Sequence, residues 1–214
     1  MTISDQLPIK AIEDLQFQQF KVHLEEVCRN SKYYSQKYNG LNIKHSDINS
    51  WEDLQKLPVL DTETLLKNNL DFPAVPESRL KRVIVSGGTT GNPKICFFGD
   101  NMQEIIHIWA SVWQAAELKK EDMVTILCPI PLASGMLITE LVEAIGCTSL
   151  PVGITSPPEF SARLMKQLNA TAIVSQPSTL QSFAEQIKEF GYYPKDFNIR
   201  KIFLGSELLT DSIR

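Results

Sequence analysis

The sequence predicts an α/β fold with a largely parallel sheet and flanking helices, preceded by a helical N-terminal segment. Short apolar runs alternate with helical stretches beyond residue 100, a pattern typical of parallel strands joined by helical crossovers. Before residue 79 the apolar residues follow helical spacing instead. The 214 residues, 43% of them hydrophobic, suffice to bury a core. We therefore expect a helical segment over residues 1–78 and an α/β subdomain over residues 79–214.

The N-terminal segment is expected to be helical, with extended links between its helices. Its apolar spacing predicts helices over residues 12–38, 50–54 and 62–69. Asn39 and Gly40 are expected to end the first helix, and Asp61 to cap the third. Residues 71–77, which include two prolines, form a loop that leads to the next feature.

The second part of the chain alternates helices and strands. The predicted helices cover residues 101–118, 136–145, 159–168 and 179–190, and the predicted strands cover 123–128, 147–152, 171–175 and 201–204. Asp100 or Asn101 begins a capping-box pattern at the first of these helices. Ligands of parallel sheets bind at the carboxyl ends of the strands. We therefore expect the loops 129–135, 175–178 and 205–207 to lie together.

A loop of small residues lies between two β-type apolar runs, 83–85 and 95–98. It consists of Ser86, Gly87, Gly88, Thr89, Thr90, Gly91, Asn92, Pro93 and Lys94. Its glycines let successive backbone N–H groups turn toward an anion, and its hydroxyls and lysine add further donors. A glycine-rich hairpin turn is the alternative, but it needs neither the vicinal threonines nor the lysine. The spacing fits neither the Walker loop nor the dinucleotide fingerprint, which counts against an unrelated phosphate-binding enzyme.

The nonapeptide 86–94 resembles the signature Ser-Ser/Gly-Gly-Thr-Thr-Gly-x-Pro-Lys of the adenylate-forming acyl/aryl-CoA ligase superfamily. Residues 51–61 and 72–76 are similar to segments of its phenylacetate-CoA ligase branch. Residues 203–207 are similar to that branch's Phe-Gly-Ala-Glu-Pro turn, with Leu208 in place of the proline. The resemblance implies that the loop closes over the phosphates of ATP and Mg²⁺, and that a carboxylate attacks the α-phosphate. It also implies that Gly205, Ser206 and Glu207 lie at the adenine, and that CoA or a carrier-protein thiol accepts the acyl group.

The acid substrate is expected to bind near an aromatic helix. Trp109 and Trp113 share one apolar face of the helix after the loop and are candidates for the wall of an aromatic acyl pocket, although a plain core stripe is the alternative. The resemblance places a further loop beside that pocket, with Leu132, Ser134 and Gly135. We expect a carboxylic acid with an aromatic or other bulky group.

The resemblance covers nearly the whole chain but only about the first half of a family member. It implies that residues 79–214 form a nucleotide-binding subdomain that is incomplete at its C-terminus. It implies a magnesium-binding glutamate, a ribose-binding aspartate and a catalytic lysine that these 214 residues do not include. We therefore expect little ligase activity from the chain alone, and association with the missing half or with a second copy. The alternative is a non-catalytic remnant or module that binds a nucleotide, an acyl ligand or a partner protein.

Composition excludes several other classes of protein. The formal net charge of -4 argues against nucleic-acid binding. No apolar run reaches the ~20 residues of a membrane span, and the N-terminus does not resemble a secretory signal. The 4 cysteines lie far apart, which favours reduced thiols over a metal site. We expect a cytoplasmic protein that binds no metal through its own residues.

Overall fold

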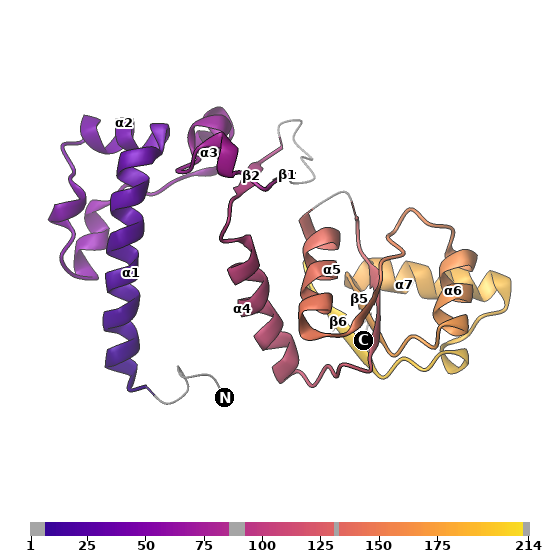
Figure 1. The fold of residues 1–214 in the computed structure, drawn as a ribbon. Helices are drawn as coiled ribbons and strands as arrows, with labels where there is room; N and C mark the ends of the chain where they lie inside the picture. The colour runs from indigo at the N-terminus through magenta and orange to yellow at the C-terminus, as the bar shows by residue number, and fades with distance from the viewer. Residues whose placement is uncertain (1–6, 86–92, 131–132, 212–214) are drawn as a thin grey trace. The chain divides into compact units, whose positions relative to one another are not determined.

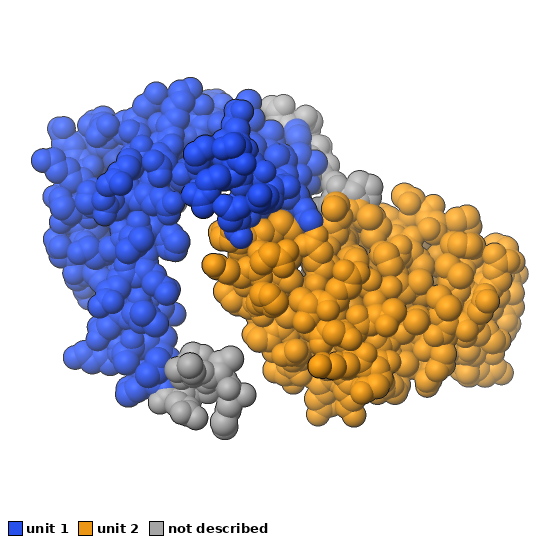
Figure 2. Space-filling view, viewed as in Figure 1, with its two compact units in different colours: residues 1–100 blue, residues 101–214 orange. Residues whose placement is uncertain are grey.

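The computed structural model describes residues 7–85, 93–130 and 133–211, apart from the side chains of residues 133 and 134. The chain forms two compact units, residues 1–100 and 101–214, which Figure 2 shows in blue and orange. From the sequence we expect a boundary after residue 78; the compact units instead divide after Asp100, which groups the β-hairpin around the loop with the N-terminal helices.

Within residues 7–85 and 93–100, the first unit consists of three α-helices, a hairpin and short 3₁₀ turns (Figure 1). Its elements are α1 (Ile9–Asn30), α2 (Lys32–Gly40), η2 (His45–Asp47), η3 (Glu52–Lys56), α3 (Thr62–Lys67), η4 (Asn69–Asp71), η5 (Glu77–Arg79), β1 (Arg82–Val85) and β2 (Ile95–Phe98). A small core forms between α1, α2 and the turns after them, around the buried side chains of Leu24, Tyr38 and Ile48.

The prediction of one helix over residues 12–38 is wrong, because the chain breaks at Ser31. Ser31 has an extended ψ of 122°, and its side chain accepts a hydrogen bond from the Tyr34 N–H to cap α2. The same hydroxyl lies 3.2 Å from the Asp71 carbonyl oxygen, to which it donates. Serine competes with the helical backbone for hydrogen bonds in this way, and here a contact 40 residues away along the chain fixes the break.

Both ends of the hairpin are tied to neighbouring residues. Strands β1 and β2 pair antiparallel from Arg82 opposite Phe98 to Val85 opposite Ile95, so that the ladder reaches the base of the loop. At the other end the Asp100 carboxylate pairs with Arg79 at 2.9 Å and with Lys81 at 3.6 Å. The predicted capping box at this point is therefore wrong. Helix α4 begins without a side-chain cap from Asn101.

The second unit is a parallel α/β sheet with helices on both faces (Figure 1), as predicted. Its elements are α4 (Met102–Ala115), β3 (Met123–Leu127), α5 (Ala133–Ile145), β4 (Thr148–Leu150), α6 (Pro158–Gln167), β5 (Ala172–Ser175), α7 (Pro177–Gln186), η6 (Ile187–Phe190), η7 (Pro194–Asp196) and β6 (Lys201–Leu204). The strand order is β4-β3-β5-β6. All three strand pairs are parallel.

The central strands are buried because both faces of the sheet are covered. Helix α5 packs against β3 and β4, and α4 packs against α5. On the other face α6 and α7 enclose a core that includes Leu127, Met165, Ile173 and Phe183. Continuous apolar runs are the sequence signature of such two-sided burial, which explains why the runs of β3 and β5 predict strands.

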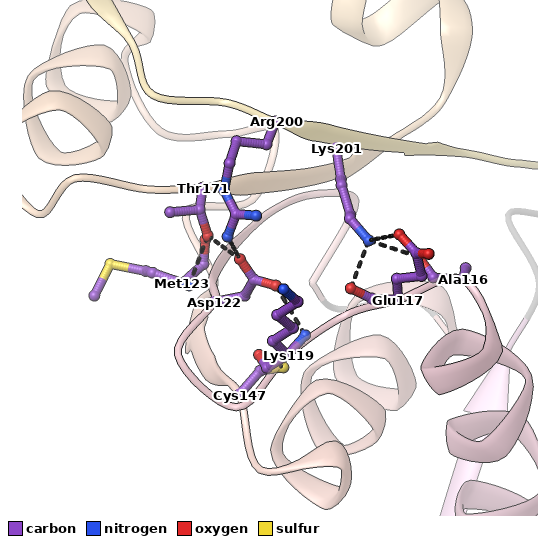
Figure 3. Close-up of polar contacts among 9 residues, drawn as sticks. All are labelled: Ala116, Glu117, Lys119, Asp122, Met123, Cys147, Thr171, Arg200 and Lys201. Carbon is purple, nitrogen blue, oxygen red and sulfur yellow. Dashed lines mark hydrogen bonds and ion pairs between the residues drawn. The ribbon is translucent and has the colours of Figure 1, made fainter.

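Polar residues join the amino ends of three strands (Figure 3). Asp122, Thr171 and Arg200 each stand directly before a strand: β3, β5 and β6. The Asp122 carboxylate, 1% exposed, accepts hydrogen bonds from the Thr171 hydroxyl at 2.6 Å and the Lys119 N–H at 2.9 Å, and also from the Arg200 guanidinium. Figure 3 also shows Lys201 donating to the carbonyls of Ala116 and Glu117, so that β6 is held to the segment after α4.

Candidate functional site

The part of the predicted phosphate loop that the structure describes is its C-terminal end. Ser86, Gly87, Gly88, Thr89, Thr90 and Gly91 lie outside the described residues. Lys94 is half-buried, and its ammonium lies 3.5 Å from the Thr62 hydroxyl at the start of α3. The Asn69 carboxamide bonds to the main chain on both sides of Lys94, at Pro93 and Ile95. The segment 62–69 therefore supports the end of the loop, which the sequence did not suggest.

A cavity of about 280 Å³ lies at the carboxyl ends of β3, β5 and β6 in the second unit. Four of its lining residues, Ser175, Gln176, Gly205 and Ser206, belong to loops that were predicted to gather at this edge. Its apolar lining includes Trp113, Ile138 and Phe203. The structure thus brings a predicted adenine-binding turn and a predicted acyl-pocket residue to one cavity.

Trp113 and Phe203 form an aromatic wall of this cavity. Their rings stack with centroids 4.8 Å apart and planes 7° from parallel. Cys128 also lines the cavity, and burial raises the pKa of its thiol, so that it stays protonated near neutral pH. Trp109, the other predicted tryptophan, is 53% exposed and does not line this cavity.

The turn after β6 is tied to the start of α7. The Glu207 carboxylate accepts hydrogen bonds from the Ser178 N–H at 3.0 Å and from the Ser178 hydroxyl at 2.8 Å. The bond from the Ser178 N–H, with the hydroxyl bond next, lowers the pKa of Glu207, so that this carboxylate is ionised at neutral pH. Ser206 adopts a φ of 68°, the left-handed region that non-glycine residues rarely occupy. The paired bonds fix this strained turn beside the cavity.

Replacing Ser206 tests whether the turn keeps its left-handed backbone in solution. Ser206→Gly is expected to leave the free energy of unfolding nearly unchanged, because glycine adopts this φ without strain. Ser206→Val is expected to lower it by about 2 kcal/mol, because a β-branched residue is an outlier there. Urea unfolding of both variants measures the difference, and equal stability of the two would contradict the observed turn.

The predicted pocket loop is only partly described. Leu132 lies outside the described residues, and Ser134 lies in the first turn of α5 with no side chain described. Gly135 is buried in the same turn and packs against the main chain of Pro129 and Ile130. Its carbonyl oxygen accepts a hydrogen bond from the Thr139 hydroxyl at 2.8 Å.

Contributors to these sites that were not predicted as site residues include Asn69, Ser178 and Phe203. Phe203 was read as part of a strand and as the first residue of the 203–207 motif, and its apolar character gives no sign that it faces Trp113. Asn69 and Ser178 act on residues 24 to 29 positions away, and such contacts leave no local pattern. Over the described ranges, no group of three or more His, Cys, Asp or Glu side chains is placed to hold a metal ion. Nor is any described helix long and apolar enough to cross a membrane.

Comparison with characterised proteins identifies the relatives of this sequence. The phenylacetate-coenzyme A ligase of Pseudomonas putida is 27% identical over 215 residues, which cover 96% of this chain and 47% of the relative. This chain is similar to the phenylacetate-CoA ligases. The Escherichia coli enzyme of the same name is 25% identical, covering 96% of this chain and 48% of its own length. The chain thus spans about half the length of the curated relatives it matches, and no family model matches it.

Solved structures show the same fold. A 2-hydroxyisobutyryl-CoA ligase in complex with 2-HIB-AMP and CoA superposes with a TM-score of 0.85 at 19% identity, covering 94% of this chain and 44% of that one. An open conformation of the same ligase gives a TM-score of 0.84 at 18% identity, over 94% of this chain and 49% of that one. The predicted resemblance to adenylate-forming CoA ligases, in their phenylacetate-CoA ligase branch, is confirmed.

Proposed function

We propose that this chain provides the ATP-phosphate-binding and acyl-binding part of an acid–thiol ligase resembling phenylacetate-CoA ligase. One observation carries the proposal: the nonapeptide 86–94 occurs in a chain that is similar to these ligases over 96% of its length. In the proposed reaction a carboxylate oxygen attacks the α-phosphorus of ATP, which forms an acyl-adenylate and releases pyrophosphate. A thiolate of CoA or of a carrier protein then attacks the acyl carbon and releases AMP.

The proposed roles follow from the repulsion between the substrate carboxylate and the phosphates of ATP, which are both anions. The phosphate charge would be screened during in-line attack by donors of the loop. These donors are the hydroxyls of Ser86, Thr89 and Thr90, the N–H groups of Gly87, Gly88 and Gly91, and the Lys94 ammonium. Gly205, Ser206 and Glu207 would bind the adenine, and the Ser178 bonds to Glu207 support this assignment by fixing the turn. No group of three or more His, Cys, Asp or Glu side chains among the described residues is placed to hold a metal ion, so Mg²⁺ enters the proposal only as part of the ATP complex.

The cavity supports an acid with a flat or bulky apolar group. A planar ring would bury apolar area against the stacked Trp113 and Phe203, and aromatic pairs of this kind add about 1 kcal/mol beyond the buried area. Gly135 and Ser134, with Leu132, remain proposed neighbours of the acyl group. Trp109 does not line the 280 Å³ cavity, so it remains a proposed contact of the acid substrate only outside this cavity.

Acid-dependent exchange of pyrophosphate into ATP tests the proposed function. We expect exchange when the chain is supplied with the remaining half of the P. putida relative as a separate polypeptide, and a loss of about 100-fold in the double variant Thr89→Ala/Thr90→Ala. Thr148→Ala is the control, because Thr148 is exposed on β4. Equal exchange by the double variant and the control would remove the role given to the loop.

The second candidate is a module that binds a nucleotide, an acyl ligand or a partner protein without catalysis. It is considered because the chain matches only 47% of the P. putida enzyme's length. This candidate predicts that ATP raises the melting temperature of the chain while no exchange occurs under any condition, including after addition of the second half. Association with that half or with a second copy is expected under either candidate, and sedimentation velocity measures it.

A further inference from the structure

The carboxamide of Asn69 bonds to the main chain on both sides of Lys94. Its Nδ2 donates to the Pro93 carbonyl oxygen at 3.0 Å, and its Oδ1 accepts from the Ile95 N–H at 3.2 Å. A carboxamide carries both a donor and an acceptor, so it can make these two bonds at once. The peptide groups before and after Lys94 are therefore held by one residue that lies 24 to 26 positions earlier in the chain.

The segment that carries Asn69 is itself fixed. Asp61 caps α3 by accepting from the Thr64 N–H at 2.7 Å, and Asn68 ends that helix by donating from its side chain to the Thr64 carbonyl at 2.8 Å. Thr62, at the start of the same helix, contacts the Lys94 ammonium at 3.5 Å. The short helix α3 and the turn η4 that follows it thus hold both the main chain around Lys94 and the end of its side chain.

We propose that Asn69 is a positioning residue for the phosphate site, because it sets the place at which Lys94 presents its ammonium. The inference rests on the proposed function, in which Lys94 faces the phosphates of ATP. A lysine has a long, flexible side chain, so placing its ammonium against a ligand costs less conformational entropy when the peptide that carries it is already fixed. The β1–β2 ladder fixes Ile95 from one side, and Asn69 supplies the second support.

The test compares two adjacent asparagines. Asn69→Ala removes both bonds at Lys94, whereas Asn68→Ala removes a bond within α3 alone and controls for general loss of stability. ATP binding is measured by calorimetry at a temperature where both variants are folded. Asn69→Ala is expected to weaken ATP binding about tenfold and Asn68→Ala hardly at all, since a lost hydrogen bond at a positioning contact is worth about a factor of ten. Asn69→Gln, which keeps the amide, is expected to recover part of the lost affinity.

A second readout follows Lys94 itself. The rate of its acylation by an acetylating reagent, read by mass spectrometry relative to Lys81, is expected to rise in Asn69→Ala, because the half-buried Lys94 loses its support. Lys81 serves as the reference because its ion-pair partner is Asp100. The inference would be overturned if Asn69→Ala and Asn68→Ala had the same affinity for ATP and the same rate of Lys94 acylation. If the wild-type chain binds no ATP, the proposed function fails, and the acylation rates alone then decide whether Asn69 positions Lys94.

Discussion

Replacing Asp122 with alanine is expected to lower the free energy of unfolding of the second unit by about 3 kcal/mol, because hydrogen bonds to a charged acceptor contribute about 1.5 kcal/mol each. The buried carboxylate accepts from the Thr171 hydroxyl and the Lys119 N–H, and both donors would lose their acceptor. Its ion pair with Arg200 adds less, because the Arg200 side chain is 45% exposed. Chemical unfolding followed by circular dichroism measures the change.

The matched control for this variant is Glu121→Ala, which removes the neighbouring carboxylate from an exposed position. Its stability is expected to stay within about 0.5 kcal/mol of the wild type. A loss in Asp122→Ala no larger than that in Glu121→Ala would show that the three strand ends are not held by Asp122.

Asp122 also makes the free energy of unfolding depend on pH. Burial by itself raises the pKa of this carboxyl group. The hydrogen bonds from Thr171 and Lys119 and the charges of Arg200 and Lys201 outweigh burial, so that the pKa lies below its usual value near 3.8. A lowered folded-state pKa means that the stabilisation is complete above the unfolded-state pKa and is lost as the pH falls through the folded-state value. The difference in stability between the wild type and Asp122→Ala is therefore expected to shrink below about pH 4.

Gly135→Ala is the second substitution with a large expected effect. A Cβ at this position would lie 2.6 Å from both the Ile130 Cα and the Pro129 carbonyl oxygen. Both atoms belong to the main chain, so the clash is relieved only by moving the loop or the start of α5. We expect a loss of about 3 kcal/mol in the free energy of unfolding, the cost typical of overpacking a buried site.

The comparison for Gly135→Ala is Gly205→Ala, because a Cβ at Gly205 meets no other atom within 4 Å. The alanine variant at 205 is expected to unfold at nearly the wild-type urea concentration, and the variant at 135 at a clearly lower one. If Gly135→Ala were as stable as Gly205→Ala, the close approach between α5 and the 129–130 segment would be absent in solution.

The elements that the sequence predicted well are those whose burial leaves a local pattern. Strand β6 (Lys201–Leu204) was predicted with its observed bounds, although alternate residues of this edge strand are exposed. Strands β3 and β5 were predicted within one residue at their ends, because strands buried on both faces read as continuous apolar runs. Asp61 was recognised as the cap at the start of a helix for a similar reason, because a side-chain cap requires particular residue types.

What the sequence could not show depends on contacts between distant residues. The break at Ser31 is stabilised by a bond to the Asp71 carbonyl, and Asp100 was assigned to a helix cap because its partners Arg79 and Lys81 lie in an earlier segment. The same limit applies to the candidate site. The nonapeptide and the 205–207 turn are local motifs, whereas Asn69, Ser178 and the Trp113–Phe203 stack become visible only when the chain is folded.

The central claim is that the loop ending at Lys94 binds the phosphates of ATP. Calorimetric titration of ATP with Mg²⁺ into the wild-type chain and into Thr89→Ala/Thr90→Ala tests it most directly. We expect saturable binding by the wild type that weakens at least about tenfold in the double variant, while Thr148→Ala binds as the wild type does. Equal affinity of the wild type and the double variant, or no binding by a folded wild-type chain, would contradict the claim.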